Sequence, residues 1–164
     1  MALAKATQNA ADAVSTANVK LNQANAAVRT TEAEIEKTNQ ELALAQTKWT
    51  AAGEAINVAK TALTTIGKQM QQAESRFRLA TAGIKDVGTS VDGLAAKLTL
   101  LREKIALQEQ AITQYEAALE AAKQQLEAAQ QANDPGKIHQ ASDAVIEAQT
   151  NLNNAKATMA SLRS

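Results

Sequence analysis

The sequence predicts an all-α protein, a long antiparallel coiled coil or helical hairpin of about three helices. Apolar side chains recur every seven residues along most of the chain. Residues that favour helices dominate the composition, with alanine the most frequent apolar residue and aromatic residues only 2% of the total. The strongest helix breakers, one proline and six glycines, are few, and three of the glycines fall within residues 83–93.

The apolar repeat starts at Val14 and stays in phase to Leu126. We call its large apolar members row a: Val14, Leu21, Val28, Ile35, Leu42, Trp49, Ile56, Leu63, Met70, Phe77, Ile84, Val91, Leu98, Ile105, Ile112, Leu119 and Leu126. Row d lies three residues after each, and it contains only Ala or Thr from Ala17 to Ala59. A strict seven-residue repeat predicts a left-handed supercoil. Large a against small d residues predicts a close approach of the helices.

The sharpest interruption of this pattern is the turn at Asp134, Pro135 and Gly136. Proline in a helix interior removes a hydrogen bond and clashes with the preceding turn. Asp134 is a favourable N-cap, and Pro135 then fits the first helical position. The apolar repeat restarts out of phase at Ile138, so the sequence predicts a helical hairpin here.

A second interruption is predicted at residues 83–93. Its three glycines disfavour a helix, and Thr89 followed by Asp92 resembles a capping box. We therefore favour a turn or hinge, and a continuous but weakened helix is the alternative because row a keeps its phase across the segment. The predicted helices are roughly 3–82, 90–132 and 136–163, within one elongated coiled-coil domain, 1–164.

The first predicted helix is too long for the other two to cover when they fold back beside one another. We therefore expect an uncovered interaction row that self-associates or binds a partner helix: Val14, Leu21, Val28, Ile35, Leu42, Trp49, Ile56 and Leu63. Leu3 already fits the seven-residue spacing ahead of row a, and Leu162 is a d residue of the restarted repeat two residues from the end, which suggests a fragment of a longer protein. An intact small protein with frayed ends is the alternative.

Composition and motifs argue against a catalytic, cofactor or metal site in this chain. The 17 basic and 17 acidic residues balance, so a nucleic-acid partner is not expected. Cysteine is absent, and His139 is the only histidine, without recognisable metal-ligand spacing. No phosphate-binding glycine loop or nucleophile elbow occurs. We expect no enzyme activity, catalytic residue, cofactor or metal site.

The C-terminal third carries a resemblance to a known family. An alanine-rich helix from Tyr115, the Asp134-Pro135-Gly136 turn and a second helix rich in Ala, Gln, Glu and Asn follow one another to Leu162. This stretch resembles the N-terminal coiled-coil region of the hydrophobic translocator proteins of bacterial type III secretion. The resemblance implies a virulence-associated translocator, whose membrane-inserting segments would lie outside this chain.

Two functions follow as expectations. One is a non-enzymatic assembly region, the soluble coil of a secretion translocator or related pore-forming system, secreted without a Sec-type signal and not itself contacting the membrane. The alternative is a structural coiled-coil scaffold or spacer without a membrane role, in the cytoplasm. No N-terminal stretch pairs a basic start with an apolar run, and no segment approaches 18 consecutive apolar residues.

Overall fold

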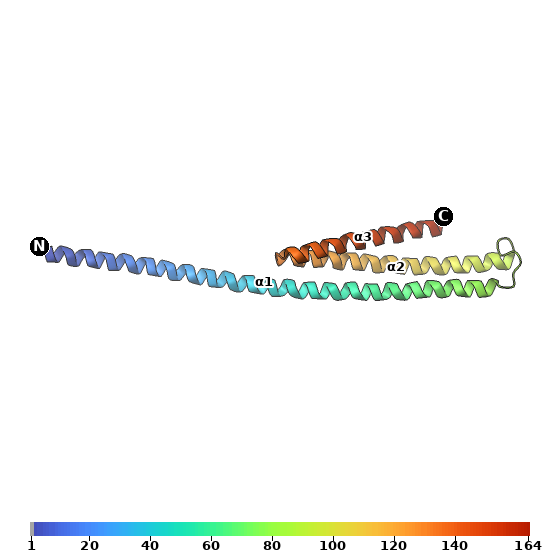
Figure 1. Ribbon diagram of the computed structural model, residues 1–164, viewed down its shortest axis with the longest axis horizontal. Helices are drawn as coiled ribbons and strands as arrows, with labels where there is room; N and C mark the ends of the chain where they lie inside the picture. Colours follow the sequence, from blue (N-terminus) through green and yellow to red (C-terminus); the bar gives the residue numbers. More distant parts are fainter. Residues whose placement is uncertain (1) are drawn as a thin grey trace. The chain divides into compact units, whose positions relative to one another are not determined.

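The computed structural model describes residues 2–164, which form three helices and no strand. Helix α1 is Ala2–Thr81, α2 is Val91–Gln131 and α3 is Pro135–Arg163 (Figure 1). The predicted all-α class and helix number are confirmed, whereas supercoiling stays a prediction. The chain forms two compact units, one ending at Leu44 and the other comprising Ala45–Ser164. The expected single domain, 1–164, stays a prediction.

A turn separates α1 from α2, so the continuous-helix alternative for residues 83–93 is wrong. The N-cap of α2 is Ser90, whose hydroxyl accepts a hydrogen bond from the Gly93 amide at 3.2 Å. The helix is therefore capped by Ser90, one residue after the expected Thr89. Gly93 is buried, and a Cβ atom there would lie 2.5 Å from the carbonyl oxygen of Val87. The turn thus requires glycine because of close backbone approach.

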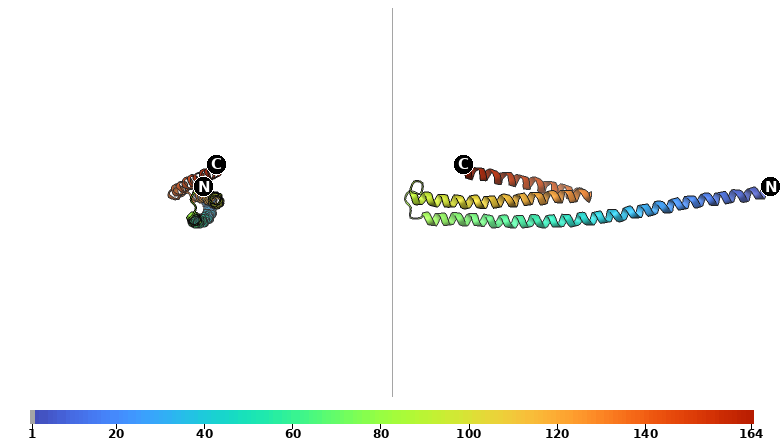
Figure 2. Two further views of the ribbon diagram at one scale, coloured as in Figure 1. Left: turned by 90° about the vertical axis from the view of Figure 1, so that its right-hand side faces the viewer. Right: turned by 180° about the vertical axis from the view of Figure 1, so that it is seen from behind.

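In the unit Ala45–Ser164, α2 lies beside both the covered part of α1 and α3 (Figures 1 and 2). Contacts along α1 and α2 run in opposite directions. Lys104 Nζ lies 2.6 Å from Glu74 Oε1, while Gln125 Nε2 donates to the Trp49 carbonyl oxygen at 3.3 Å. Residue numbers therefore rise on α1 as they fall on α2, and these two segments are antiparallel.

Ion pairs flank the apolar contact between α1 and α2. The Lys104 ammonium lowers the pKa of Glu74, first by donating a hydrogen bond to its carboxylate and then by its positive charge. Arg76 and Glu103 form a second pair at 3.0 Å. All four side chains keep substantial contact with water, so the pairs orient the helices more than they stabilise them.

Row d, rather than row a, forms the centre of the α1 contact in this unit. The buried residues of α1 all belong to row d: Ala45, Ala52, Ala59, Ile66 and Ala73. Row a residues Trp49, Ile56 and Leu63 are only half-buried. The small row d side chains let the helix backbones approach closely, so they are enclosed more deeply than the larger row a residues. The row a residues lie at the edges of the contact.

Helix α2 uses a further apolar row, which the seven-residue repeat did not predict. Ala111, Ala118, Ala121 and Ala128 are buried but belong to neither row a nor row d. Their successive spacings of seven, three and seven residues place them on one helical face, a pattern hidden among many exposed alanines. A helix packed on two sides needs two apolar rows, and α2 lies between two others.

The hairpin between α2 and α3 has the predicted turn. Asp134 is the N-cap, and its Oδ1 accepts from the Lys137 amide at 3.1 Å; Pro135 begins α3. Asn133 adopts a left-handed backbone with φ of 49°. Asparagine tolerates this conformation better than most residues. The change of direction is therefore encoded in consecutive residues of the chain.

The α2–α3 contact contains one buried polar residue. Gln108, in row d of α2, is 7% exposed and donates through Nε2 to the Ala155 carbonyl oxygen at 2.9 Å. Apolar residues of α3 enclose the rest of the contact: Ala141, Leu152, Ala155 and Met159. Because a buried amide without a partner is costly, this hydrogen bond favours one register of α3 on α2.

Candidate helix-binding surface

The N-terminal part of α1 carries a line of exposed apolar side chains. Between 50% and 60% of the surface of each is exposed: Val14, Leu21, Val28, Ile35 and Leu42. They recur every seven residues, so they form one stripe along the helix. The stripe winds slowly around the helix axis with a left-handed sense. We call these five residues the exposed row a. Large apolar residues at heptad spacing are the pattern by which one helix packs on another.

The small residues beside this row complete an apolar strip. Ala17, Ala24, Thr31 and Thr38 occupy row d and are exposed. The two threonine hydroxyls donate within the helix, from Thr31 to the Ala27 carbonyl at 3.1 Å and from Thr38 to the Glu34 carbonyl at 2.8 Å. With their donors satisfied, these threonines can present methyl groups to a neighbouring helix without leaving an unpaired hydroxyl hydrogen.

Charged residues lie at the edges of the strip. Lys20 directly precedes Leu21, and Glu34 directly precedes Ile35. Among residues 2–164, neither side chain belongs to an ion pair. Residues at these heptad positions face the flanks of a partner helix and select its direction. The strip thus has an apolar centre and charged edges.

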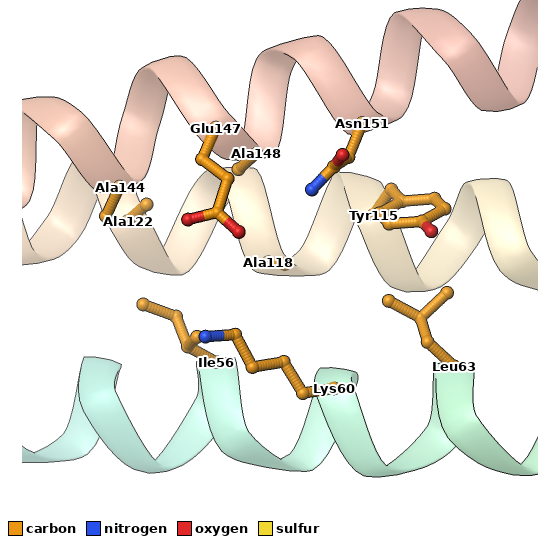
Figure 3. Close-up of a pocket in the computed structure, with 10 residues that line it drawn as sticks. All are labelled: Ile56, Lys60, Leu63, Tyr115, Ala118, Ala122, Ala144, Glu147, Ala148 and Asn151. Carbon is orange, nitrogen blue, oxygen red and sulfur yellow. The ribbon is translucent and has the colours of Figure 1, made fainter.

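The other three members of the predicted interaction row have different surroundings. Trp49 is half-buried, with the Lys137 ammonium 5.6 Å from its ring centroid. Ile56 and Leu63 line a groove in the unit Ala45–Ser164, where all three helices contribute residues (Figure 3). The structure therefore divides the predicted row into an exposed group and a group already engaged within the chain.

The three-helix groove has an apolar floor and a mixed rim. Ile56 and Leu63 face Tyr115, Ala118 and Ala122 across it (Figure 3). Lys60 and Glu147 point into the groove from opposite helices. Within residues 2–164 no cluster of His, Cys, Asp or Glu could hold a metal ion. His139 lies on the surface, 3.6 Å from Asp143.

The turn residues lie apart from the exposed row a in sequence and serve a structural purpose. Asp134 and Pro135 start α3, and Gly136 follows in its first turn. Lys137, the next residue, donates from Nζ to Gln46 Oε1 at 3.1 Å, which ties the start of α3 to α1. These residues position a hairpin and form no recognisable ligand site.

Comparisons with models of protein families, with curated protein sequences and with solved structures found no match to this chain. Among residues 2–164, no helix combines the length and hydrophobicity needed to cross a membrane. The candidate site is consequently defined by its own chemistry: a helical strip of five large apolar side chains, small neighbours and charged flanks.

Proposed function

We propose that this chain is a non-enzymatic assembly region that binds another helix through the exposed row a. The observation that supports this most directly is five large apolar side chains, at least 50% exposed, at an unbroken seven-residue spacing. Scattered exposed apolar residues are common on protein surfaces, but contiguous apolar surface marks interaction sites. The regular spacing suits a helical partner.

The energetics of long helices support the same proposal. Most helical stability in proteins comes from packing an apolar face, because propensity alone is a weak contribution. Residues 2–44 present such a face to solvent, and fully burying a large aliphatic side chain contributes about 1.5–3 kcal/mol. Binding a partner helix would therefore stabilise this part of α1 while forming the complex.

A narrower proposal is that this assembly region is the soluble coil of a bacterial secretion translocator or related pore-forming system. The alanine-rich hairpin with its Asp134-Pro135-Gly136 turn supports this proposal. A structural scaffold or spacer would use the same helix pairing without a membrane role. An apolar segment of about 20 residues elsewhere in the parent reading frame would favour the translocator.

We expect this chain alone to cause no leakage from dye-loaded liposomes. Aromatic residues make up only 2% of the sequence and the formal net charge is zero, so the usual anchors for binding at a lipid interface are scarce. Leakage is measured as dye release over a range of protein concentrations, with a lytic amphipathic peptide as the positive control. Release by this chain would contradict an assembly role without membrane action.

The helix-binding proposal is tested by site-specific photo-cross-linking in cells that produce the protein. A photoreactive residue at Leu21 or Ile35 is expected to give cross-linked protein products, since a partner helix would cover these positions. Matched controls are Val19 and Leu44, which are 54% and 56% exposed but lie outside rows a and d. Products are separated by mass and identified by peptide sequencing.

Selective cross-linking is the decisive result. Products from Leu21 and Ile35 but not from Val19 and Leu44 would support a helix-binding strip, whether the captured protein is this chain or another. Equal yields at all four positions would show only general surface exposure. That outcome, or no product from any position, would contradict the proposed function.

A further inference from the structure

Row d of α1 changes from buried to exposed along one continuous helix. Ala45, Ala52 and Ala59 are 1–2% exposed within the unit Ala45–Ser164. Row d continues in phase toward the N-terminus through exposed residues: Ala10, Ala17, Ala24, Thr31 and Thr38. The chain therefore already uses this row for an antiparallel contact, and the exposed part has the same design.

We propose that residues 10–42 of two copies of this chain pair antiparallel, each copy packing its exposed row a on row d of the other. This inference rests on the proposed function and names its partner as a second copy. The register places each large residue against a small one, in five layers that occur twice: Leu42 with Ala10, Ile35 with Ala17, Val28 with Ala24, Leu21 with Thr31, and Val14 with Thr38.

The sizes of the side chains favour the antiparallel direction. In an antiparallel pair, a residues of one helix face d residues of the other, so every layer here would combine one large and one small side chain. A parallel pair in register would stack Leu21 on Leu21 and Ala24 on Ala24. Its layers would alternate between thick and thin, and the helices could not keep one close separation.

The charged flanks favour the same direction. In the proposed register Lys20 of each copy lies across from Glu34 of the other, which places two opposite-charge pairs at the edges of the contact. In a parallel pair the same positions face Asn25 and Asn39, and no opposite charges meet. The pairs therefore distinguish the two directions even though exposed ion pairs contribute little to affinity.

The neighbouring registers are less favourable. A shift of one heptad in one direction would place Val14 against Ala45, which is 1% exposed because it is already enclosed. The opposite shift would place Leu42 against Leu3 and would separate Lys20 from Glu34. Only the proposed register pairs the whole exposed row a with exposed small residues and opposite charges.

Sedimentation equilibrium of the full chain tests the association. We expect a reversible dimer, and we expect Leu21→Asp to weaken it at least about 100-fold, because each dimer would bury two added charges and lose two apolar contacts. Val19→Asp is the matched control, since Val19 is similarly exposed but off the strip. A wild-type monomer up to millimolar concentration, or equal loss in both variants, would overturn the proposal.

Charge exchange tests the register without changing the apolar contact. Lys20→Glu and Glu34→Lys should each weaken dimerisation about tenfold, because each places like charges together twice per dimer. The double variant should restore the wild-type dissociation constant. A double variant no tighter than the single variants would contradict the Lys20–Glu34 pairing between copies.

Cysteine cross-linking tests the direction, and the natural sequence contains no cysteine. Ala27→Cys lies next to the expected two-fold axis and should form a covalent dimer with a short bismaleimide. Ala17→Cys should not, since the two copies of residue 17 would lie about 27 Å apart along the helices. Efficient cross-linking at residue 17 would indicate a parallel pair and overturn the proposal.

These outcomes distinguish self-pairing of the chain from binding of another helix. A monomeric chain that still gives selective photo-cross-links to a different protein at Leu21 and Ile35 would overturn self-pairing and leave the helix-binding strip supported. A dimer that survives Leu21→Asp while selective photo-cross-links are absent would contradict both. Circular dichroism and Trp49 fluorescence check that the unit Ala45–Ser164 remains folded in every variant.

Discussion

Replacing Leu152 with alanine is expected to lower the free energy of unfolding of the unit Ala45–Ser164 by about 2–5 kcal/mol. Leu152 is 5% exposed and is one of the few large side chains enclosed between α3 and α2. The other buried residues of α2 and α3 are largely alanine, so small side chains are available but few large ones could move to fill the space. The loss should therefore combine reduced apolar burial with a residual cavity.

Urea unfolding followed by circular dichroism measures this effect, and Trp49 fluorescence reports on it independently. Trp49 is the only tryptophan and lies 5.6 Å from the Lys137 ammonium near the start of α3, so detachment of α3 should change its emission. Ile146→Ala is the matched control on the same helix, because Ile146 is 62% exposed. It should change stability by less than about 0.5 kcal/mol. Equal losses in the two variants would contradict the assigned core.

Gly93→Ala should destabilise the turn between α1 and α2 by about 1–3 kcal/mol, although helix propensity alone predicts a gain of about 1 kcal/mol. The added Cβ would lie 2.5 Å from the Val87 carbonyl oxygen and 2.6 Å from the Val87 Cα atom. These are backbone atoms, so the clash is relieved only by moving the turn or the first residues of α2. The Ser90 cap on the Gly93 amide would be disturbed as well.

Gly67→Ala is the control with the opposite expected sign. Gly67 lies in the interior of α1, and no heavy atom outside its own helical turn falls within 4 Å of an added Cβ. Alanine there should stabilise the chain by about 1 kcal/mol, since it lowers the conformational entropy of the unfolded chain and has a higher helix propensity than glycine. Thermal unfolding of both variants provides the measurement. A stabilised Gly93→Ala variant would show that the turn does not need the close approach.

The arrangement of helices was largely predictable because local chemistry encodes it. The seven-residue repeat predicted helices, and Asp134 with Pro135 predicted where α3 starts. Clustered glycines predicted the break between α1 and α2. The observed N-cap, Ser90, lies one residue after the predicted Thr89. Ser and Thr are both competent N-caps, and only the surrounding backbone selects between them.

The burial of each row was less predictable. Large row a residues were expected to pack against small row d residues. Within the unit Ala45–Ser164, however, row d of α1 is the more deeply enclosed, with Ala45, Ala52, Ala59 and Ala73 only 1–2% exposed. The second row of α2, with Ala111 and Ala118, escaped notice because alanine is common on both exposed and buried helical faces. Periodicity identifies a face, but the number of neighbouring helices decides how many faces are needed.

The sequence by itself determined where this chain is helical, where it turns, and that an apolar row runs along its first helix from Val14. Those features depend on backbone propensity, capping and spacing, which are local. Only the tertiary structure decided that Ile56 and Leu63 line a three-helix groove while Val14 to Leu42 stay exposed. It also decided that Gly93 tolerates no side chain whereas Gly67 does. Both depend on which backbone lies alongside, a property that no short stretch of sequence contains.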